Sequence, residues 1–270
     1  MHPILIRIGP LTIPSYGFLF ASGVLLGILV ILRLAKREGL DVRVVGDFLF
    51  YVLLFGLLGA KLLLLVTNLN YYLRFPGEIR YLLTSGGTFF GGLIGGVIFA
   101  AFFIRRKRMN FRSLADITVF GLTLGHFFGR LGCLAAGCCW GRPAGRFPLA
   151  VTFTSRQANQ LTGVPLNRPL YPTQPLEAVL NLINFFVLWI VYRRRRFKGQ
   201  VFVIYLFNYS LIRLLMEYFR GDPDRGYVWG SQAHPFISLS IPQLICLFGL
   251  AAAVALYRIF KKKGEKENPA

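Results

Sequence analysis

The side chains of this sequence that are best suited to chemistry are charged residues that interrupt apolar segments. Arg213, Glu217 and Arg220 follow one another at intervals of four and three residues, so a helix would carry them on one face. His126 and Arg130 are four residues apart and would also share a helix face. Because the planar guanidinium group of arginine suits phosphate oxygens, these two groups indicate a site for an anion that carries phosphate.

Three of the four cysteines follow Arg130 closely in the sequence. Cys133, Cys138 and Cys139 have the spacing C-x4-C-C, which is not a standard zinc spacing, and we therefore predict no metal site. Four cysteines are too few for a disulfide scaffold, although one disulfide that involves Cys138 or Cys139 is an alternative. Packing as a small apolar side chain is the default for Cys133 and Cys246. A redox or metal protein built on the three neighbouring cysteines is a further alternative.

The composition is that of a membrane protein. Of the 270 residues 55% are hydrophobic, and the mean hydropathy is +0.56, which is rare for a soluble domain. The chain has 31 basic and 11 acidic residues, a net charge of +20. The basic residues form short clusters between apolar segments, as in the cytoplasmic loops of membrane proteins, so we expect no nucleic acid as a partner.

Seven segments are long and apolar enough to span a bilayer, which requires about 20 residues each. The predicted spans are 14–34, 46–67, 86–104, 115–135, 174–192, 199–219 and 238–260. The fold class that we predict is an all-α membrane protein with seven transmembrane helices. In the third span, glycines recur every fourth residue at Gly87, Gly91 and Gly95, a spacing that lets two helices approach closely.

The charges of the connecting segments predict the orientation of the chain. Clusters of Lys and Arg follow the first, third, fifth and seventh spans, so the N-terminus is expected outside and the C-terminus in the cytoplasm. We predict a single polytopic membrane domain over 1–270, a long extracytoplasmic loop at 136–173 and a basic cytoplasmic tail at 261–270. No signal peptide is recognised before the first span, which we expect to remain in the mature protein.

With this orientation, the charged residues within the spans gather in the outer half of the membrane. They are Lys61, Arg130, Glu177, Arg213, Glu217 and Arg220. Their net charge is positive, and a cationic cavity at headgroup depth suits the phosphate of an anionic lipid. The alternative interpretation is structural: the arginines extend to the interface, and Arg213 forms a satisfied ion pair with Glu217.

Several motifs resemble those of the prolipoprotein diacylglyceryl transferase family. GRLGCLAAGCCWGR resembles the family signature G-R-x-G-N-F-x-N-x-E-x-x-G. PSYGFLF resembles the tyrosine-glycine motif of the first span, and GGTFFGGLIGG resembles H-G-G-L-I-G. YPTQPLEA resembles H-P-(S/T)-Q-L-Y-E, and LIRLLMEYFRGDPDRG resembles R-x-x-x-E-x-x-R. The motifs occur in the family's order and cover about residues 8–260.

The resemblance implies an enzyme that transfers a diacylglyceryl group from phosphatidylglycerol to the lipobox cysteine thiol of a lipoprotein precursor, with release of glycerol phosphate. It implies that Arg130 and Arg213 are the catalytic residues and that Arg130 contacts the lipid phosphate. Tyr16 would contact lipid or substrate. The remaining polar positions expected to bind the lipid or line its cavity are Lys61, Gln174, Glu177, Glu217 and Arg220.

Three departures from the family motifs matter for the chemistry, and YPTQPLEA also lacks the histidine and tyrosine of its counterpart. Phe90 stands where the family has the histidine of H-G-G, Cys133 replaces the signature asparagine, and Cys138 replaces its glutamate. A proposed general base is therefore missing, and His126 or Glu217 is the candidate to replace it. A hydrogen-bonded structural role is the alternative for His126.

The expected location is the bacterial plasma (inner) membrane, in a multi-pass arrangement. The expected partners are phosphatidylglycerol and the signal peptide of a lipoprotein precursor with its lipobox cysteine, and no cofactor is expected. The alternative function is a lipid-binding or lipid-transporting membrane protein without this chemistry.

Overall fold

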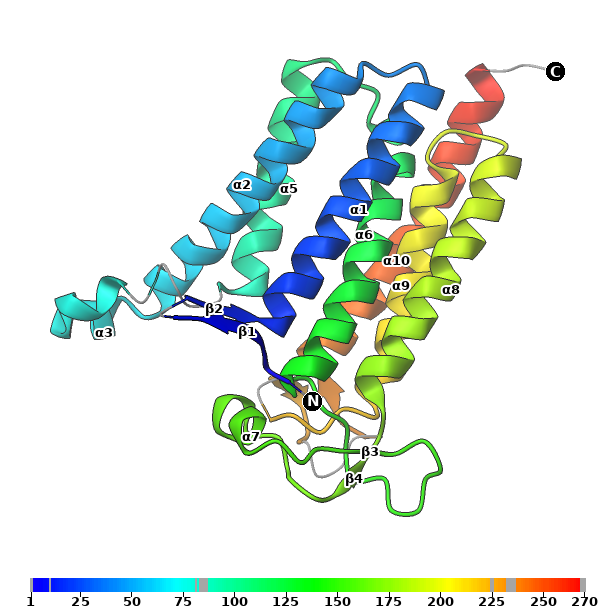
Figure 1. Cartoon of the computed structure of the whole chain (residues 1–270). Helices are drawn as coiled ribbons and strands as arrows, with labels where there is room; N and C mark the ends of the chain where they lie inside the picture. The colour runs from blue at the N-terminus through cyan, green and yellow to red at the C-terminus, as the bar shows by residue number, and fades with distance from the viewer. Residues whose placement is uncertain are drawn as a thin grey trace. The chain divides into compact units, whose positions relative to one another are not determined.

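Helices dominate the structure, a computed structural model that describes residues 2–9, 11–80, 82, 87–223, 226–231 and 237–267 (Figure 1). Within these residues, seven helices are long and apolar enough to cross a membrane. They are α1 (Ser15–Arg37), α2 (Val42–Thr67), α5 (Phe89–Arg106), α6 (Phe111–Ala136), α8 (Thr173–Arg194), α9 (Gln200–Glu217) and α10 (Ile241–Glu267). Each overlaps one predicted span, so the predicted fold class is confirmed, while the orientation of the termini stays a prediction.

The connections contain short helices and strands that hydropathy did not predict. The helices are α3 (Leu69–Arg74), a 3-10 helix at Pro76–Arg80 and α7 (Arg156–Thr162). Three antiparallel pairs are formed by β1 (Ile4–Ile8) with β2 (Leu11–Pro14), β3 (Val151–Thr152) with β4 (Pro169–Leu170), and β5 (Tyr227–Trp229) with β6 (Leu239–Ser240). Strands of two to five residues are too short to leave a clear periodic signal in the sequence.

The chain forms two compact units, one of Met1–Ile31 with Ala115–Ala270 and one of Leu32–Leu114. In the second unit, α2 and α5 pack against each other through glycines. A Cβ atom at Gly59 would overlap the carbonyl oxygen of Gly91, and one at Gly95 would overlap that of Phe55. The predicted close approach of a helix at the glycine repeat is therefore confirmed. The predicted domain boundaries stay predictions.

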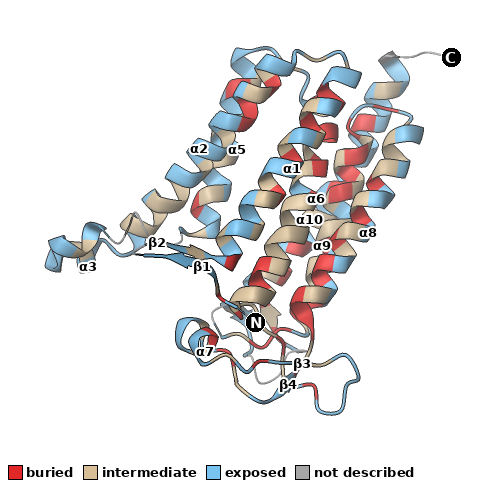
Figure 2. Cartoon of the chain, in the orientation of Figure 1, coloured by how far each residue is buried: buried red, intermediate tan, exposed pale blue. Residues whose placement is uncertain are grey.

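In the first unit, α9 packs between α8 and α10. The inward faces of α6, α8 and α9 contain many buried residues, whereas most side chains of α2 and α5 are exposed (Figure 2). The segment between α6 and α8 has a small core of its own, made by Phe153, Ala158, Val164 and Leu170. This core gives the long predicted loop a defined structure, from which the segment returns to the start of α8.

A buried carboxylate fixes the start of α9. Asp116 on α6 accepts hydrogen bonds from the backbone nitrogens of Gly199 (2.7 Å) and Phe202 (2.9 Å) and lies 3.5 Å from Arg195. These are backbone donors of the kind that a helix leaves unsatisfied in its first turn. Asp116 therefore caps α9 from another helix, a role that the sequence analysis did not identify.

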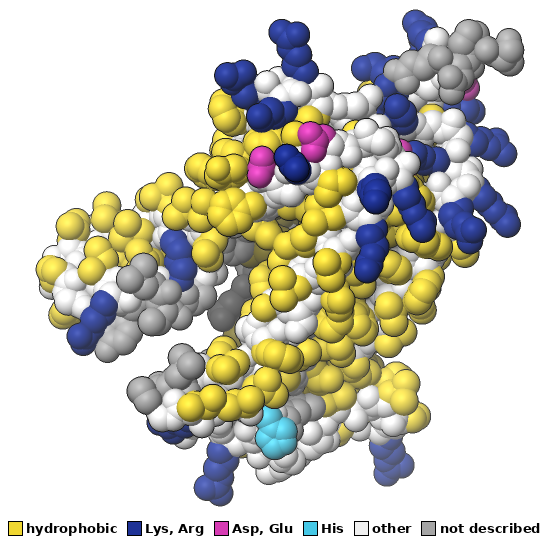
Figure 3. Space-filling model, turned by 45° about the horizontal axis from the view of Figure 1, so that its top comes forward, with side chains coloured by type: hydrophobic (Ala, Val, Ile, Leu, Met, Phe, Trp, Pro, Cys, Tyr) yellow, Lys and Arg dark blue, Asp and Glu magenta, His cyan; other side chains and the backbone are white. Residues whose placement is uncertain are grey.

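The outer surfaces of the helices are apolar. Hydrophobic side chains cover the sides of the helices in the space-filling view, and Lys and Arg side chains gather at helix ends (Figure 3). Large exposed side chains such as Phe50, Leu57 and Phe186 would be unfavourable in water and are expected where helices face lipid. This surface agrees with seven membrane-spanning helices.

Candidate active site

The centre of the candidate site is an ion pair between α6 and α8. Arg130 Nη2 lies 2.8 Å from Glu177 Oε1, with 15% of the arginine side chain and 1% of the glutamate side chain exposed. The second carboxylate oxygen, Glu177 Oε2, is buried and has no hydrogen-bond partner among the described residues. The structure thus joins two predicted site residues that are 47 positions apart in the sequence and leaves one buried carboxylate oxygen without a hydrogen-bond partner among the described residues.

A second buried ion pair lies within α9. Arg213 Nη1 is 2.8 Å from Glu217 Oε2, in a geometry outside that of a hydrogen bond. The other oxygen, Glu217 Oε1, accepts a hydrogen bond from Ser240 Oγ at 3.1 Å, at the start of α10. The ion pair expected as the structural alternative is therefore present, and it attaches α9 to α10.

The two arginines share a pair of aromatic neighbours. His126 Nε2 lies 3.1 Å from the hydroxyl oxygen of Tyr205, and its ring stacks on Tyr209 at 4.4 Å between centroids. Arg130 lies one helical turn after His126 on α6, and Arg213 lies one turn after Tyr209 on α9. Both arginines thus lie close to one aromatic layer. One ring nitrogen of His126 is already hydrogen-bonded to a tyrosine hydroxyl, which supports a structural role for this histidine. Its role as base stays a prediction.

The segment after α6 is held by side chains at the start of α8. Gln174 Nε2 donates to the carbonyl oxygen of Cys138 at 2.9 Å, and Thr173 Oγ1 donates to that of Cys139 at 3.0 Å. Both donors are buried. Gln174 therefore fixes the segment beside Arg130, and a direct contact of Gln174 with lipid stays a prediction.

The next residues of the segment run between the end of α9 and the start of α8. The backbone nitrogen of Arg142 donates to Phe219 O at 2.8 Å, and that of Tyr171 donates to Arg142 O at 2.8 Å. A Cβ atom at Gly141 would overlap the carbonyl oxygen of Tyr171. Only glycine fits this close backbone approach, which explains the last glycine of the GRLGCLAAGCCWG motif.

Arg220 lies just beyond α9 and is engaged by a partner that the sequence analysis did not name. Its guanidinium group forms a two-point ion pair with Asp222, in which Nε lies 2.8 Å from Oδ1. Burial opposes the charge of Arg220, but the carboxylate of Asp222 and the sulfur of Cys139 outweigh it and raise the pKa of the guanidinium group. Arg220 therefore remains charged, although its contact with a lipid is a prediction.

Tyr16 and Lys61 fall in different units. Tyr16 belongs to α1 and packs against the backbone of Gly132, two residues after Arg130, with 41% of the residue exposed. It is thus available to a ligand beside α6. Lys61 belongs to the second unit, where its Nζ donates to Leu82 O at 2.7 Å. The lipid contact of Lys61 stays a prediction.

The buried face of α8 contains polar residues that the sequence analysis missed. Asn181 and Asn184 follow Glu177 at intervals of four and three residues and are buried. Asn208 of α9 donates to Asn184 Oδ1 at 2.9 Å. Repeated amides at helical spacing within an apolar span were the available signal, because such side chains turn toward the interior of a helix bundle.

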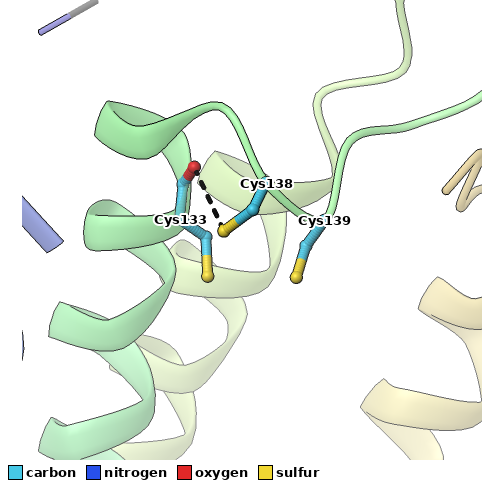
Figure 4. Close-up of side chains that lie close together, drawn as sticks. All are labelled: Cys133, Cys138 and Cys139. Atoms are coloured by element: carbon cyan, nitrogen blue, oxygen red, sulfur yellow. Dashed lines mark hydrogen bonds between the residues drawn. The ribbon is translucent and has the colours of Figure 1, made fainter. Parts of the chain in front are cut away.

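The three cysteines after Arg130 come together in space (Figure 4). Interaction with the thiols of Cys133 and Cys138 lowers the pKa of the Cys139 thiol, and the charges of Arg220 and Arg130 act in the same direction. The Cys138 thiol donates to the carbonyl oxygen of Cys133 at 3.9 Å. Interaction with the Cys133 thiol lowers the pKa of Cys138, but interaction with Cys139 and burial prevail and raise that pKa to about 12. The surroundings of Cys139 therefore favour its thiolate form.

Comparison with known proteins agrees with the resemblance noted in the motifs. A model of the family "Prolipoprotein diacylglyceryl transferase" matches residues 3–259. The chain belongs to the prolipoprotein diacylglyceryl transferase family. It is 32% identical over 267 residues to the phosphatidylglycerol–prolipoprotein diacylglyceryl transferase of Clostridium tetani, covering 97% of this chain and 100% of the relative.

Two further relatives support the same assignment. The chain is 32% identical to transferase 2 of Clostridium perfringens, with 99% of both chains covered. It is 31% identical to the transferase of Francisella tularensis subsp. novicida, covering 99% of this chain and 97% of the relative. The predicted family is confirmed over the whole length of these transferases.

The structure places the residues that take part in the resemblance to the prolipoprotein diacylglyceryl transferase family. Arg130, which stands at the arginine of the family signature in the motif resemblance, lies in the buried pair with Glu177. Two of the three departures from the motifs, Cys133 and Cys138, lie in the cysteine group immediately after it. The third, Phe90, lies in the second unit and is 45% exposed.

Proposed function

We propose that this chain transfers the diacylglyceryl group of phosphatidylglycerol to the lipobox cysteine thiol of lipoprotein precursors, with release of glycerol phosphate. The observation that carries the proposal is the Arg130–Glu177 pair, in which a partly exposed arginine adjoins a buried carboxylate. The seven helices and the bacterial relatives fit a multi-pass protein of the inner membrane. In this location the enzyme can meet both a membrane lipid and the signal peptide of a precursor.

The arginines provide the electrostatic part of the mechanism. The guanidinium group of Arg130 binds the lipid phosphate, and Arg213, one helical turn after the stacked Tyr209, adds a second positive charge. Negative charge grows on the leaving phosphate as its bond to the glyceryl carbon breaks. Positive groups held in place in a site of low water content stabilise that charge in the transition state.

Glu177 is the proton acceptor that the geometry favours. The substrate sulfur attacks the glyceryl carbon that bears the phosphate, a C–S bond forms, the C–O bond breaks, and the electron pair leaves with glycerol phosphate. The thiol proton passes to Glu177 Oε2, the carboxylate oxygen without a partner among the described residues. When the lipid phosphate takes the guanidinium group of Arg130, the Glu177 carboxylate loses its cation and is free to accept the proton.

An apolar groove beside Arg130 suits an acyl chain of the lipid. It has a volume of about 410 Å³ and lies between the start of α1, with Phe18 and Leu19, and the end of α6, with Leu131 and Leu134. A second groove lies between α9 and α10 and includes Phe207 and Tyr257. Neither groove is lined by a predicted site residue, but the first includes Leu131, which directly follows Arg130. We therefore assign the acyl chain to the first groove.

Complementation tests the proposed function. The chain is expressed in a bacterium depleted of its own diacylglyceryl transferase, and the mass of a lipoprotein precursor is measured. We expect the mass increase of one diacylglyceryl group with the wild type and none with Arg130→Ala, although the variant inserts into the membrane. Arg156→Ala, at an exposed arginine of α7, is the matched control and should retain transfer.

A second variant tests the proton acceptor. Glu177→Gln preserves the size of the side chain but cannot accept the thiol proton, so kcat should fall by about 100-fold or more. Unchanged kcat would refute this role of Glu177 but not the transfer itself. Stable binding of phosphatidylglycerol without any covalent product would instead favour the lipid-binding alternative.

A further inference from the structure

The cysteine group after α6 has the geometry of a metal site. The sulfur atoms of Cys133, Cys138 and Cys139 all lie within 4.8 Å of one another. A metal with sulfur bonds of about 2.3 Å holds three sulfurs in a plane about 4 Å apart, so the three thiols need to close in only slightly. The sequence spacing did not predict this because only the fold of the segment brings the side chains together.

The backbone conformation after α6 turns the three cysteine side chains toward one another. Cys133 lies in the last turn of α6, and Cys138 and Cys139 follow the helix end (Figure 4). Gly137 has a φ of 80° and Cys139 a φ of 57°, both in the left-handed region. A residue other than glycine rarely adopts that conformation, and the strain it carries is often found at functional sites. Here it places the Cys139 sulfur beside the other two.

Side chains at the start of α8 hold the backbone of two of the three cysteines in place. The carbonyl oxygens of Cys138 and Cys139 accept hydrogen bonds from the buried side chains of Gln174 and Thr173. These bonds fix the backbone that carries two of the three thiols, so they support the ligands from outside the site. Cys133 is buried, whereas Cys138 and Cys139 are partly exposed, so an ion could reach the group.

We propose that Cys133, Cys138 and Cys139 form a three-thiolate site for a soft monovalent cation, Cu(I). Among the described residues no further His, Cys, Asp or Glu belongs to the group. Structural zinc sites almost always take four ligands, whereas soft thiolates without such a fourth ligand suit Cu(I). Each thiol that binds the ion releases its proton to solvent, and no redox change is involved. The proposed Cu(I) site does not rest on the proposed transfer reaction.

The test is a competition titration of the purified full-length protein. The protein is kept in detergent without oxygen, its thiols are reduced, and Cu(I) is titrated against a coloured Cu(I) chelator. We expect one Cu(I) per chain. Loss of even a supporting partner typically weakens metal binding 10- to 100-fold, so Cys133→Ser or Cys139→Ser should weaken it by about 100-fold or more. Cys246→Ser removes the fourth cysteine, which lies on α10, and should bind Cu(I) as the wild type does.

A measurement on the unaltered chain guards against variants that fail to fold. Cu(I) should protect Cys138 and Cys139 of the wild type from alkylation, as followed by peptide mass spectrometry. Alkylation at an unchanged rate would overturn the proposal, as would binding that Cys133→Ser leaves intact or a clear preference for Zn(II). A disulfide between two of the three cysteines in protein isolated from membranes would also overturn it.

Discussion

The two units of the chain pack their helices in opposite ways. In the second unit, α2 and α5 meet backbone to backbone at glycines, and Ser113 is the one buried polar residue that the structure describes there. In the first unit, buried charged residues lie between the helices, including Asp116, Glu177 and Glu217. Apolar helices can therefore pack without ionisable groups. Because such groups are costly inside a membrane, their concentration in the first unit indicates a functional site.

The largest expected effect comes from breaking the ion pair of the first unit. Arg130→Met leaves the buried carboxylate of Glu177 without its cation, which should lower the free energy of unfolding by about 3–5 kcal/mol. The double variant Arg130→Met/Glu177→Leu removes both charges and should recover most of that loss. Denaturant titration in detergent measures stability, and the precursor mass measures activity. A double variant that recovered both would show that the pair is structural only.

A glycine substitution in the second unit should have the next largest effect. In Gly91→Ala, the added Cβ would overlap the carbonyl oxygen of Gly59 and the side chain of Leu63. We expect a loss of about 2–3 kcal/mol, as for overpacked cores. Gly46→Ala on α2 is the matched control, because no atom lies within 4 Å of the added Cβ. That variant should be stabilised by up to about 1 kcal/mol through helix propensity. Equal effects in the two variants would contradict the close packing.

A smaller effect is expected where each unit caps a helix with an aspartate. Asp116→Asn replaces one of the carboxylate oxygens that accept from Gly199 and Phe202 by an amide donor, so we expect a loss of about 1–2 kcal/mol. Asp41 caps α2 at an exposed position, and asparagine caps a helix about as well as aspartate. Asp41→Asn should therefore change the midpoint of thermal unfolding very little. A larger loss of stability for Asp41→Asn than for Asp116→Asn would contradict this difference between the two caps.

Hydropathy was sufficient to predict the seven helices because each is a local apolar segment. The partners of the charged residues were harder to predict. Arg130 pairs with Glu177 on a different helix, and Arg220 pairs with Asp222, which lies beyond the end of α9. A sequence shows which residues share a helix face, but pairs between helices depend on how the helices pack. The cysteine group depends further on two left-handed backbone positions that the residue types alone do not reveal.

The smallest expected effect concerns the hydrogen bond by which α8 holds the cysteine group of the first unit. Thr173→Val removes the hydrogen bond to the carbonyl oxygen of Cys139 but keeps the shape of the side chain. We expect a loss of about 1 kcal/mol in stability. The affinity for Cu(I) should fall by about tenfold, because Thr173 supports a ligand without binding the ion.

Thr118→Val is the matched control for this last comparison. The Thr118 hydroxyl donates to Ala115 O within α6, away from the cysteines, so its removal should change stability slightly and Cu(I) affinity not at all. If both variants bind Cu(I) as the wild type does, the hydrogen bond from α8 does not orient Cys139. The backbone conformation of the segment would then be sufficient to hold the three cysteines together. The difference between the two units would concern only the packing of their helices.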